Sequence, residues 1–132
     1  MYLRFVLPWR DPNSRVEAGF FRAAYDMARR QDRVPEWIRA ELSRELDWFD
    51  EELPVPCRVC RSFKRRRTIH GVCWFRPRAD EAIDRARYAG WLMSEAGVSV
   101  REIRTSRLGE VIWRDDHQVV AKPDRGLPVA FH

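Results

Sequence analysis

The stretch from Cys57 to Arg78, CRVCRSFKRRRTIHGVCWFRPR, separates two parts of the chain that differ in pattern. Its first half is a basic segment that is predicted to form a loop. Its second half contains an apolar run, GVCWFR at 71–76, which has no turn residue inside it and predicts a strand. We place this strand centrally in a sheet, because the chain before it is mainly helical in pattern and the chain after it alternates helix with strand.

Hydrophobic periodicity assigns the remaining elements. The clearest helical pattern is Ile38, Leu42, Leu46, Phe49 and Leu53, whose spacing of three and four residues places them on one face. The predicted helices are 15–30, 35–52 and 79–96, and the predicted strands are 2–7, 71–76, 98–105, 110–114 and 117–122.

This order, β-α-α-β-α-β-β-β, indicates the α+β fold class: a mostly antiparallel sheet with helices packed on one face. A chain of 132 residues is the size of a single domain and can bury one core without metal or disulfides. We predict one α+β domain over 1–122 and a C-terminal tail over 123–132, where Pro, Gly and Asp loosen the pattern.

The positive charge of the chain is concentrated in one place. The net charge is +5, yet the acid-free segment from Leu53 to Ala79 holds eight Lys or Arg, which leaves −3 for the rest. A local basic patch favours an anionic partner, and nucleic acid is the leading one. Phe63, Trp74 and Phe75 could stack on a base. The alternative is a solvated loop facing the acids that end the preceding helix. The predicted contacts are Arg58, Arg61, Lys64, Arg65, Arg66 and Arg67.

A second hypothesis is a protein–protein interaction module, such as a phage or mobile-element factor that acts on a host complex. Its contact surface would consist of Trp37, Trp48, Tyr88 and Trp91. Trp37 and Trp48 lie eleven residues apart and project in nearly the same direction from one helix. Packing against a neighbouring element is the plainer interpretation for them, whereas exposed and contiguous aromatic side chains would favour a protein partner.

Cys57, Cys60, His70 and Cys73 have the spacing C-x2-C-x9-H-x2-C, and their side chains are ligands that Zn²⁺ accepts. The spacing matches no zinc knuckle or finger that we can name. Cys73 also lies in a predicted strand, where a cysteine is usually a small buried apolar residue. We therefore predict no metal or other cofactor, and keep zinc as the alternative.

No catalytic motif is present, and we predict that the protein is not an enzyme. HExxH, GxSxG, P-loop and GxGxxG patterns are all absent. Asp115 and Asp116 are typical turn residues, and His117 is expected to face solvent. The other titratable residues considered for acid–base chemistry are Asp47, Asp50, Glu51 and His70.

The compartment is predicted from what the chain lacks. The apolar run at its start is interrupted by Arg4 and ended by Pro8, so we expect no secretory signal. No apolar stretch approaches the roughly 18 residues that span a bilayer. We expect a cytoplasmic protein with reduced thiols and no membrane partner; the sequence leaves its oligomeric state open.

Three segments, WFDEELPVP at 48–56, CWFRP at 73–77 and HQVVAKP at 117–123, resemble a group of small uncharacterised bacterial single-domain proteins. The resemblance covers most of the chain and implies a bacterial or phage-borne domain. It implies no mechanism, because these segments carry no recognised chemistry. CWFRP belongs to the shared pattern and the CxxC pair does not.

Overall fold

The computed structural model describes residues 1–12, 14–30, 33–53, 61–64, 67–127 and 129–131; for 61–64, 67–70 and 130–131 it describes the backbone alone. Its strands are β1 (Tyr2–Arg10), β2 (Glu17–Gly19), β3 (Arg61–Lys64), β4 (Arg67–His70), β5 (Val72–Phe75), β6 (Arg101–Thr105), β7 (Val111–Arg114), β8 (Gln118–Ala121) and β9 (Ala130–Phe131). Its helices are α1 (Phe21–Arg29), α2 (Glu36–Glu52) and α4 (Asp80–Glu95).

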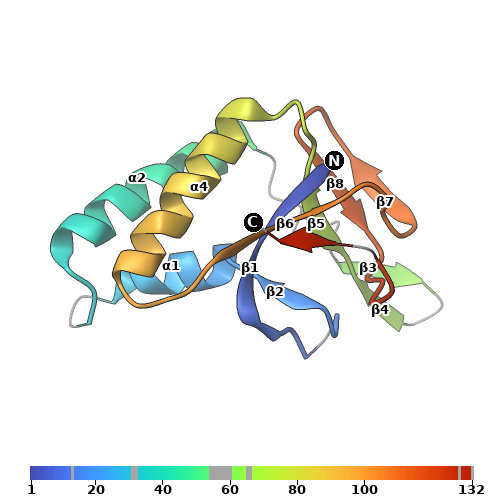
Figure 1. The fold of residues 1–132 in the computed structure, drawn as a ribbon, viewed down its shortest axis with the longest axis horizontal. Coiled ribbons are helices and arrows are strands. Elements are labelled where there is room, and N and C mark those ends of the chain that lie inside the picture. The colour runs from blue at the N-terminus through green and yellow to red at the C-terminus, as the bar shows by residue number, and fades with distance from the viewer. Residues whose placement is uncertain (13, 31–32, 54–60, 65–66, 128, 132) are drawn as a thin grey trace.

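The predicted fold class is confirmed. Six strands form an antiparallel sheet in the order β7-β8-β5-β1-β6-β9, and β2 adds a seventh by pairing with β1. The three helices cover one face of this sheet, as Figure 1 shows. The strand predicted at 71–76 is β5, which lies between β8 and β1 and is therefore central, as expected.

Strand β1 alternates between two apolar layers. Leu3 and Phe5 face the helices and belong to the larger core, with α2, α4 and Phe75. Val6 faces the other side, where it joins Trp74 and Ile103 in a smaller cluster. Both faces of the central sheet are thus covered, which explains why β1 is apolar at consecutive positions.

The helix predicted at 15–30 was wrong at its start. The helix begins at Phe21, and Glu17–Gly19 form β2 instead. Backbone hydrogen bonds from Asp11 N–H to Val16 O and from Arg15 N–H to Asp11 O, both 2.8 Å, close a turn that returns the chain to β1. The turn is followed by the pairing of β2 with β1, with Val6 opposite Gly19, so the backbone of this segment bonds to the sheet and not within a helix. Gly19 also has a low helix propensity.

The basic segment also differs from the loop that the sequence predicts. Residues 61–64 and 67–70 pair as an antiparallel two-stranded sheet of their own, with Arg61 opposite His70 and Lys64 opposite Arg67. At the other end of the chain, in the predicted tail, Ala130 and Phe131 pair with β6 as β9. Among the helices that the structure describes, none is long and apolar enough to cross a membrane.

Candidate functional site

Three aromatic side chains form a continuous exposed cluster where α2 and α4 meet. The ring centroids of Trp37 and Trp91 are 6.3 Å apart, and Tyr88 stacks on Trp91 at 6.0 Å with an interplanar angle of 18°. Trp37 is 52% exposed and Trp91 is 50% exposed, whereas Tyr88 is half-buried. We call Trp37, Tyr88 and Trp91 the aromatic surface.

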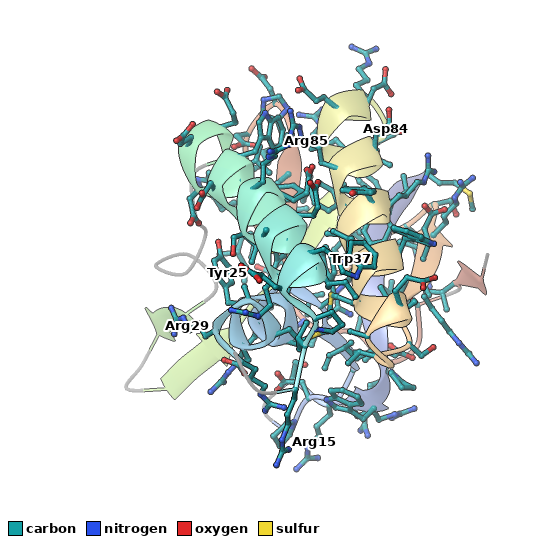
Figure 2. All side chains as sticks on the ribbon, turned by 90° about the vertical axis from the view of Figure 1, so that its left-hand side faces the viewer. Arg15, Tyr25, Arg29, Trp37, Asp84 and Arg85 are labelled. Carbon is teal, nitrogen blue, oxygen red and sulfur yellow. The ribbon has the colours of Figure 1, made fainter. Side chains whose placement is uncertain are left out.

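The inner faces of the two helices direct these rings outward. Ile38 and Leu42 of α2 and Ala89 and Leu92 of α4 are almost completely buried against the core. Trp37, Tyr88 and Trp91 each precede one of these buried residues by one position, about 100° around the helix, which places their rings toward the outer side of the pair. Figure 2 shows Trp37 there, at the junction of the two helices.

A seam of polar contacts continues from the aromatic surface along the junction of α2 and α4. The Tyr88 hydroxyl donates to Glu41 Oε2 at 3.2 Å, and the guanidinium of Arg85 donates to Glu45 Oε2 at 3.2 Å. Arg85 also pairs with Glu81 through its Nε. Desolvation first, and then the hydrogen bond to Glu41, raise the pKa of Tyr88 above its ordinary value.

Trp48 belongs to this seam and not to the aromatic surface. The guanidinium carbon of Arg85 lies 4.6 Å from the centroid of the Trp48 ring, and Trp48 packs edge-on against Phe49. The structure therefore brings together three of the four aromatic residues predicted for a protein contact. It corrects the packed position expected for Trp37, whose ring is half exposed because its nearest aromatic neighbour, Trp91, is itself on the surface.

Acidic residues dominate the surface of this helix pair. Helices α2 and α4 contain eleven Asp or Glu against four Arg, a net charge of −7, while the whole chain carries +5. The remainder of the chain is accordingly at +12. Seven of the eleven acids lie at the C-terminus of α2 and the start of α4, away from the aromatic surface. Glu36, Glu41 and Glu95 lie at the end of the pair that bears the aromatic rings, and these carboxylates attract cationic groups and repel phosphates.

The predicted nucleic-acid contacts lie only partly in the described chain. Arg58, Arg65 and Arg66 are outside it, and Arg61, Lys64 and Arg67 are described by their backbone in β3 and β4. Trp74 and Phe75 are 4% and 5% exposed, so the stacking role suggested for them was wrong: both are core residues of β5. Phe63 is described by its backbone alone, in β3.

The structure describes the four candidate zinc ligands to different degrees. Cys57 and Cys60 lie outside the described residues, and His70 has only its backbone, at the end of β4. Cys73 is half-buried in β5. Within the described part of the chain, no three His, Cys, Asp or Glu side chains are arranged to hold a metal ion.

Two of the carboxylates considered for acid–base chemistry, Asp115 and Asp50, serve local structure. Asp115 Oδ1 accepts hydrogen bonds from the backbone N–H groups of His117 at 2.8 Å and Gln118 at 2.7 Å, which makes it the turn residue that the sequence predicts. Asp50 accepts a hydrogen bond from the Tyr25 hydroxyl. Asp116 and His117 are exposed, as are Asp47 and Glu51.

One feature that the sequence analysis missed is a small cavity on the sheet face opposite the helices. Its volume is about 80 Å³, and residues from β1, the β1–β2 turn, β5, β6 and the segment after β8 line it. The only signal in the sequence was Arg4, a cation inside an otherwise apolar strand.

Comparison of the chain with protein-family models, with curated proteins and with solved structures finds no match.

Proposed function

We propose that the protein is a protein-interaction module that binds a basic segment of a partner protein through the aromatic surface. The observation that carries the proposal is the contact between Trp37 and Trp91, two half-exposed rings 6.3 Å apart on an acidic helix pair. Tryptophan and tyrosine are the residues most enriched at the energetic centres of protein interfaces. Aromatic rings offer apolar area with little side-chain entropy to lose.

The area still available on the two tryptophans supports a real but moderate affinity. An aromatic side chain buries about 150–250 Å² in full, so two rings that are half exposed have roughly 200 Å² left to bury. At about 25 cal/mol per Å² this corresponds to roughly 5 kcal/mol before the costs of association are subtracted. Charge attraction must supply part of the remaining binding free energy, which favours a partner that carries Lys or Arg beside its apolar anchor.

The local charges define the chemistry of that partner more closely. Glu41 lies directly beside Tyr88, and Glu36 and Glu95 occupy the ends of α2 and α4 that bear the aromatic rings. An amphipathic helix with one apolar and one cationic face fits these features, because helix-in-groove recognition uses an apolar stripe with charges at its rim.

A defined peptide tests the proposal. An amphipathic helical peptide built of leucine and lysine is titrated against the protein, with the matching leucine and glutamate peptide as the control for charge. Trp37→Ala/Trp91→Ala should weaken binding of the lysine peptide by at least about tenfold, since interface tryptophans contribute about 2 kcal/mol or more. Trp9→Ala is the matched control, because Trp9 is 53% exposed and lies on β1, outside the aromatic surface.

Three results would contradict the proposal. The first is equal loss of binding in Trp9→Ala and in the double variant, and the second is equal binding of the glutamate peptide. The third is a dimer in sedimentation velocity that Trp37→Ala/Trp91→Ala converts to a monomer. That result would assign the aromatic surface to a second copy of this chain and not to a basic partner.

Nucleic acid binding by the basic segment is a second proposal. The pairing of β3 with β4 supports it, because it gathers Arg61, Lys64 and Arg67 into one short ribbon that is separate from the main sheet. Phosphate contacts would make binding fall steeply with salt. Arg65→Glu/Arg66→Glu should abolish binding to single-stranded DNA, and an affinity that does not change with salt would argue against phosphate contacts.

A further inference from the structure

The cavity on the sheet face opposite the helices is rich in cations that come from distant parts of the sequence. It lies between the β1–β2 turn, the side chain of Trp74 and the segment that follows β8, and its volume is about 80 Å³. This is room for one phosphate-sized group with accompanying water. Its five cationic lining residues are Arg4, Arg10, Arg15, Lys122 and Arg125.

The charges around the cavity are unequal. Two acidic residues, Glu17 and Asp124, line it, and Lys122 is paired with Glu110 at 2.6 Å, so the four arginines and two carboxylates of the lining leave a net charge of +2. Asp124 Oδ1 already accepts the backbone N–H of Gly126 at 2.9 Å. Within the described part of the chain, neither Arg15 nor Arg125 has an ion pair, and both side chains are exposed at the rim. The rim therefore has cationic donors to offer a ligand.

Arg4 places a further cation in the wall of the cavity. Arg4 is 8% exposed, and its guanidinium carbon lies 5.9 Å from the centroid of the Trp74 ring. On its other side the guanidinium lies beside Gly19 of β2. A Cβ added to Gly19 would be 3.7 Å from Arg4 Nη2, which is an ordinary van der Waals contact. This packing holds the guanidinium in place, and low solvent exposure strengthens its attraction for an anion.

The backbone of Arg15 supports a functional role for this rim. Arg15 has φ 61°, and it is the one non-glycine residue with positive φ in the described chain. A left-handed conformation is unfavourable for a residue with a Cβ, and such residues gather at functional sites. Asp11 holds the turn through the Arg15 N–H at 2.8 Å, and Arg10 Nη1 donates to Arg15 O at 3.5 Å.

We propose that this cavity binds a phosphate group, either as inorganic phosphate or as the phosphate of a small monoester. Arginine dominates the cationic lining, and its planar fork of donors matches phosphate oxygens better than an ammonium group does. The proposal does not depend on the aromatic surface, which lies on the helix side of the sheet. Figure 2 shows Arg15 well away from Trp37 and Arg85.

An NMR titration tests the proposal on the whole chain. Inorganic phosphate, O-phosphoserine and acetate are each added at constant ionic strength, set with sodium chloride, while the indole N–H of Trp74 and the backbone N–H of Arg15 are followed. We expect saturable shifts with phosphate and not with acetate. Saturation with O-phosphoserine as well would identify a monoester as the ligand, and saturation with phosphate alone would identify the free ion.

Charge-matched variants distinguish a specific phosphate site from general attraction between phosphate and a positively charged protein. Arg15→Gln/Arg125→Gln should weaken phosphate binding by at least about tenfold, because two charge-assisted contacts are lost. Arg78→Gln/Arg114→Gln removes the same charge from two exposed residues that do not line the cavity, and it should change the affinity by less than about twofold. Equal weakening in the two double variants, no saturable shift with phosphate, or an equal shift with acetate would overturn the proposal.

Discussion

Replacement of Arg15 by glycine should make the protein more stable while it removes a cation from the phosphate cavity. The φ of 61° costs a residue with a Cβ about 1–2 kcal/mol relative to glycine. Glycine gives back about 0.5–1 kcal/mol, because its unfolded chain has more conformational freedom to lose. The side chain of Arg15 is exposed and has no ion pair in the described chain, so its loss costs little. The net gain in the free energy of unfolding is about 0.5–1 kcal/mol.

Urea unfolding followed by tryptophan fluorescence measures this difference, with Arg15→Ala as the control. Alanine removes the same side chain and keeps the Cβ, so Arg15→Ala should not be more stable than the original protein. A gain of about 1 kcal/mol corresponds to a rise of roughly 3–5 °C in Tm for a domain of this size. The reasoning is refuted if Arg15→Gly is no more stable than Arg15→Ala. Both variants should bind inorganic phosphate more weakly, which would make stability and binding move in opposite directions for the glycine variant.

The other predictions concern the helix pair and the sheet. Trp37→Ala and Trp91→Ala should each lower the free energy of unfolding by only about 1 kcal/mol in urea, because the rings are half exposed and lose chiefly their mutual contact. Arg85→Ala should cost about 2 kcal/mol in the same assay, because it leaves the carboxylate of Glu45 buried without its cation, and a further Glu45→Leu should recover most of this. Burial acts to raise the pKa of Glu102, but hydrogen bonds from two arginines outweigh it and hold that pKa below 4.5. The lowered value means that Glu102 stabilises the fold above about pH 4.5 and loses this effect as the pH falls through the folded-state pKa. Glu102→Gln should therefore be about 1 kcal/mol less stable at pH 7, and the difference from the original protein should shrink as the pH falls below 4.5.

The sequence predicted those elements whose periodicity the core itself enforces. Ile38, Leu42 and Leu46 recur at helical spacing because one face of α2 packs on the sheet, and all three are buried. β5 was recognisable for a related reason: it is covered on both sides and therefore apolar throughout. Such patterns are readable because burial constrains consecutive residues of a strand that is covered on both faces and every third to fourth residue of a helix.

The elements that were missed depend on pairing between distant segments, which leaves little trace in a local pattern. β2 is three residues long and exists because the turn at 11–16 folds it onto β1. β9 has two residues and completes the edge of β6. The phosphate cavity was missed for the same reason, since Arg4, Arg15 and Arg125 become neighbours only in the folded chain.

The exposure of Trp37 could not be predicted, since helical spacing alone does not tell a core aromatic from a surface one. Trp37 and Trp48 project in similar directions from α2, yet Arg85 covers Trp48 and only Trp91 adjoins Trp37. The neighbouring helix thus determines which of the two is available to a partner. That information lies in the position of α4, about fifty residues later in the chain.

The charge distribution separates the candidate sites by the sign of their ligands. Glu36, Glu41 and Glu95 lie at the end of the helix pair that bears the aromatic rings, whereas four arginines line the cavity, so we expect a phosphate to be attracted to the cavity and not to the aromatic surface. Strand β1 lies between the two: Phe5 faces the helical core and Arg4 lines the cavity. The period of two along a strand explains how adjacent residues of β1 serve the core on one face and the cavity on the other. The two proposed sites share no residue, so the two proposals together predict that a basic peptide and inorganic phosphate do not compete when both are added.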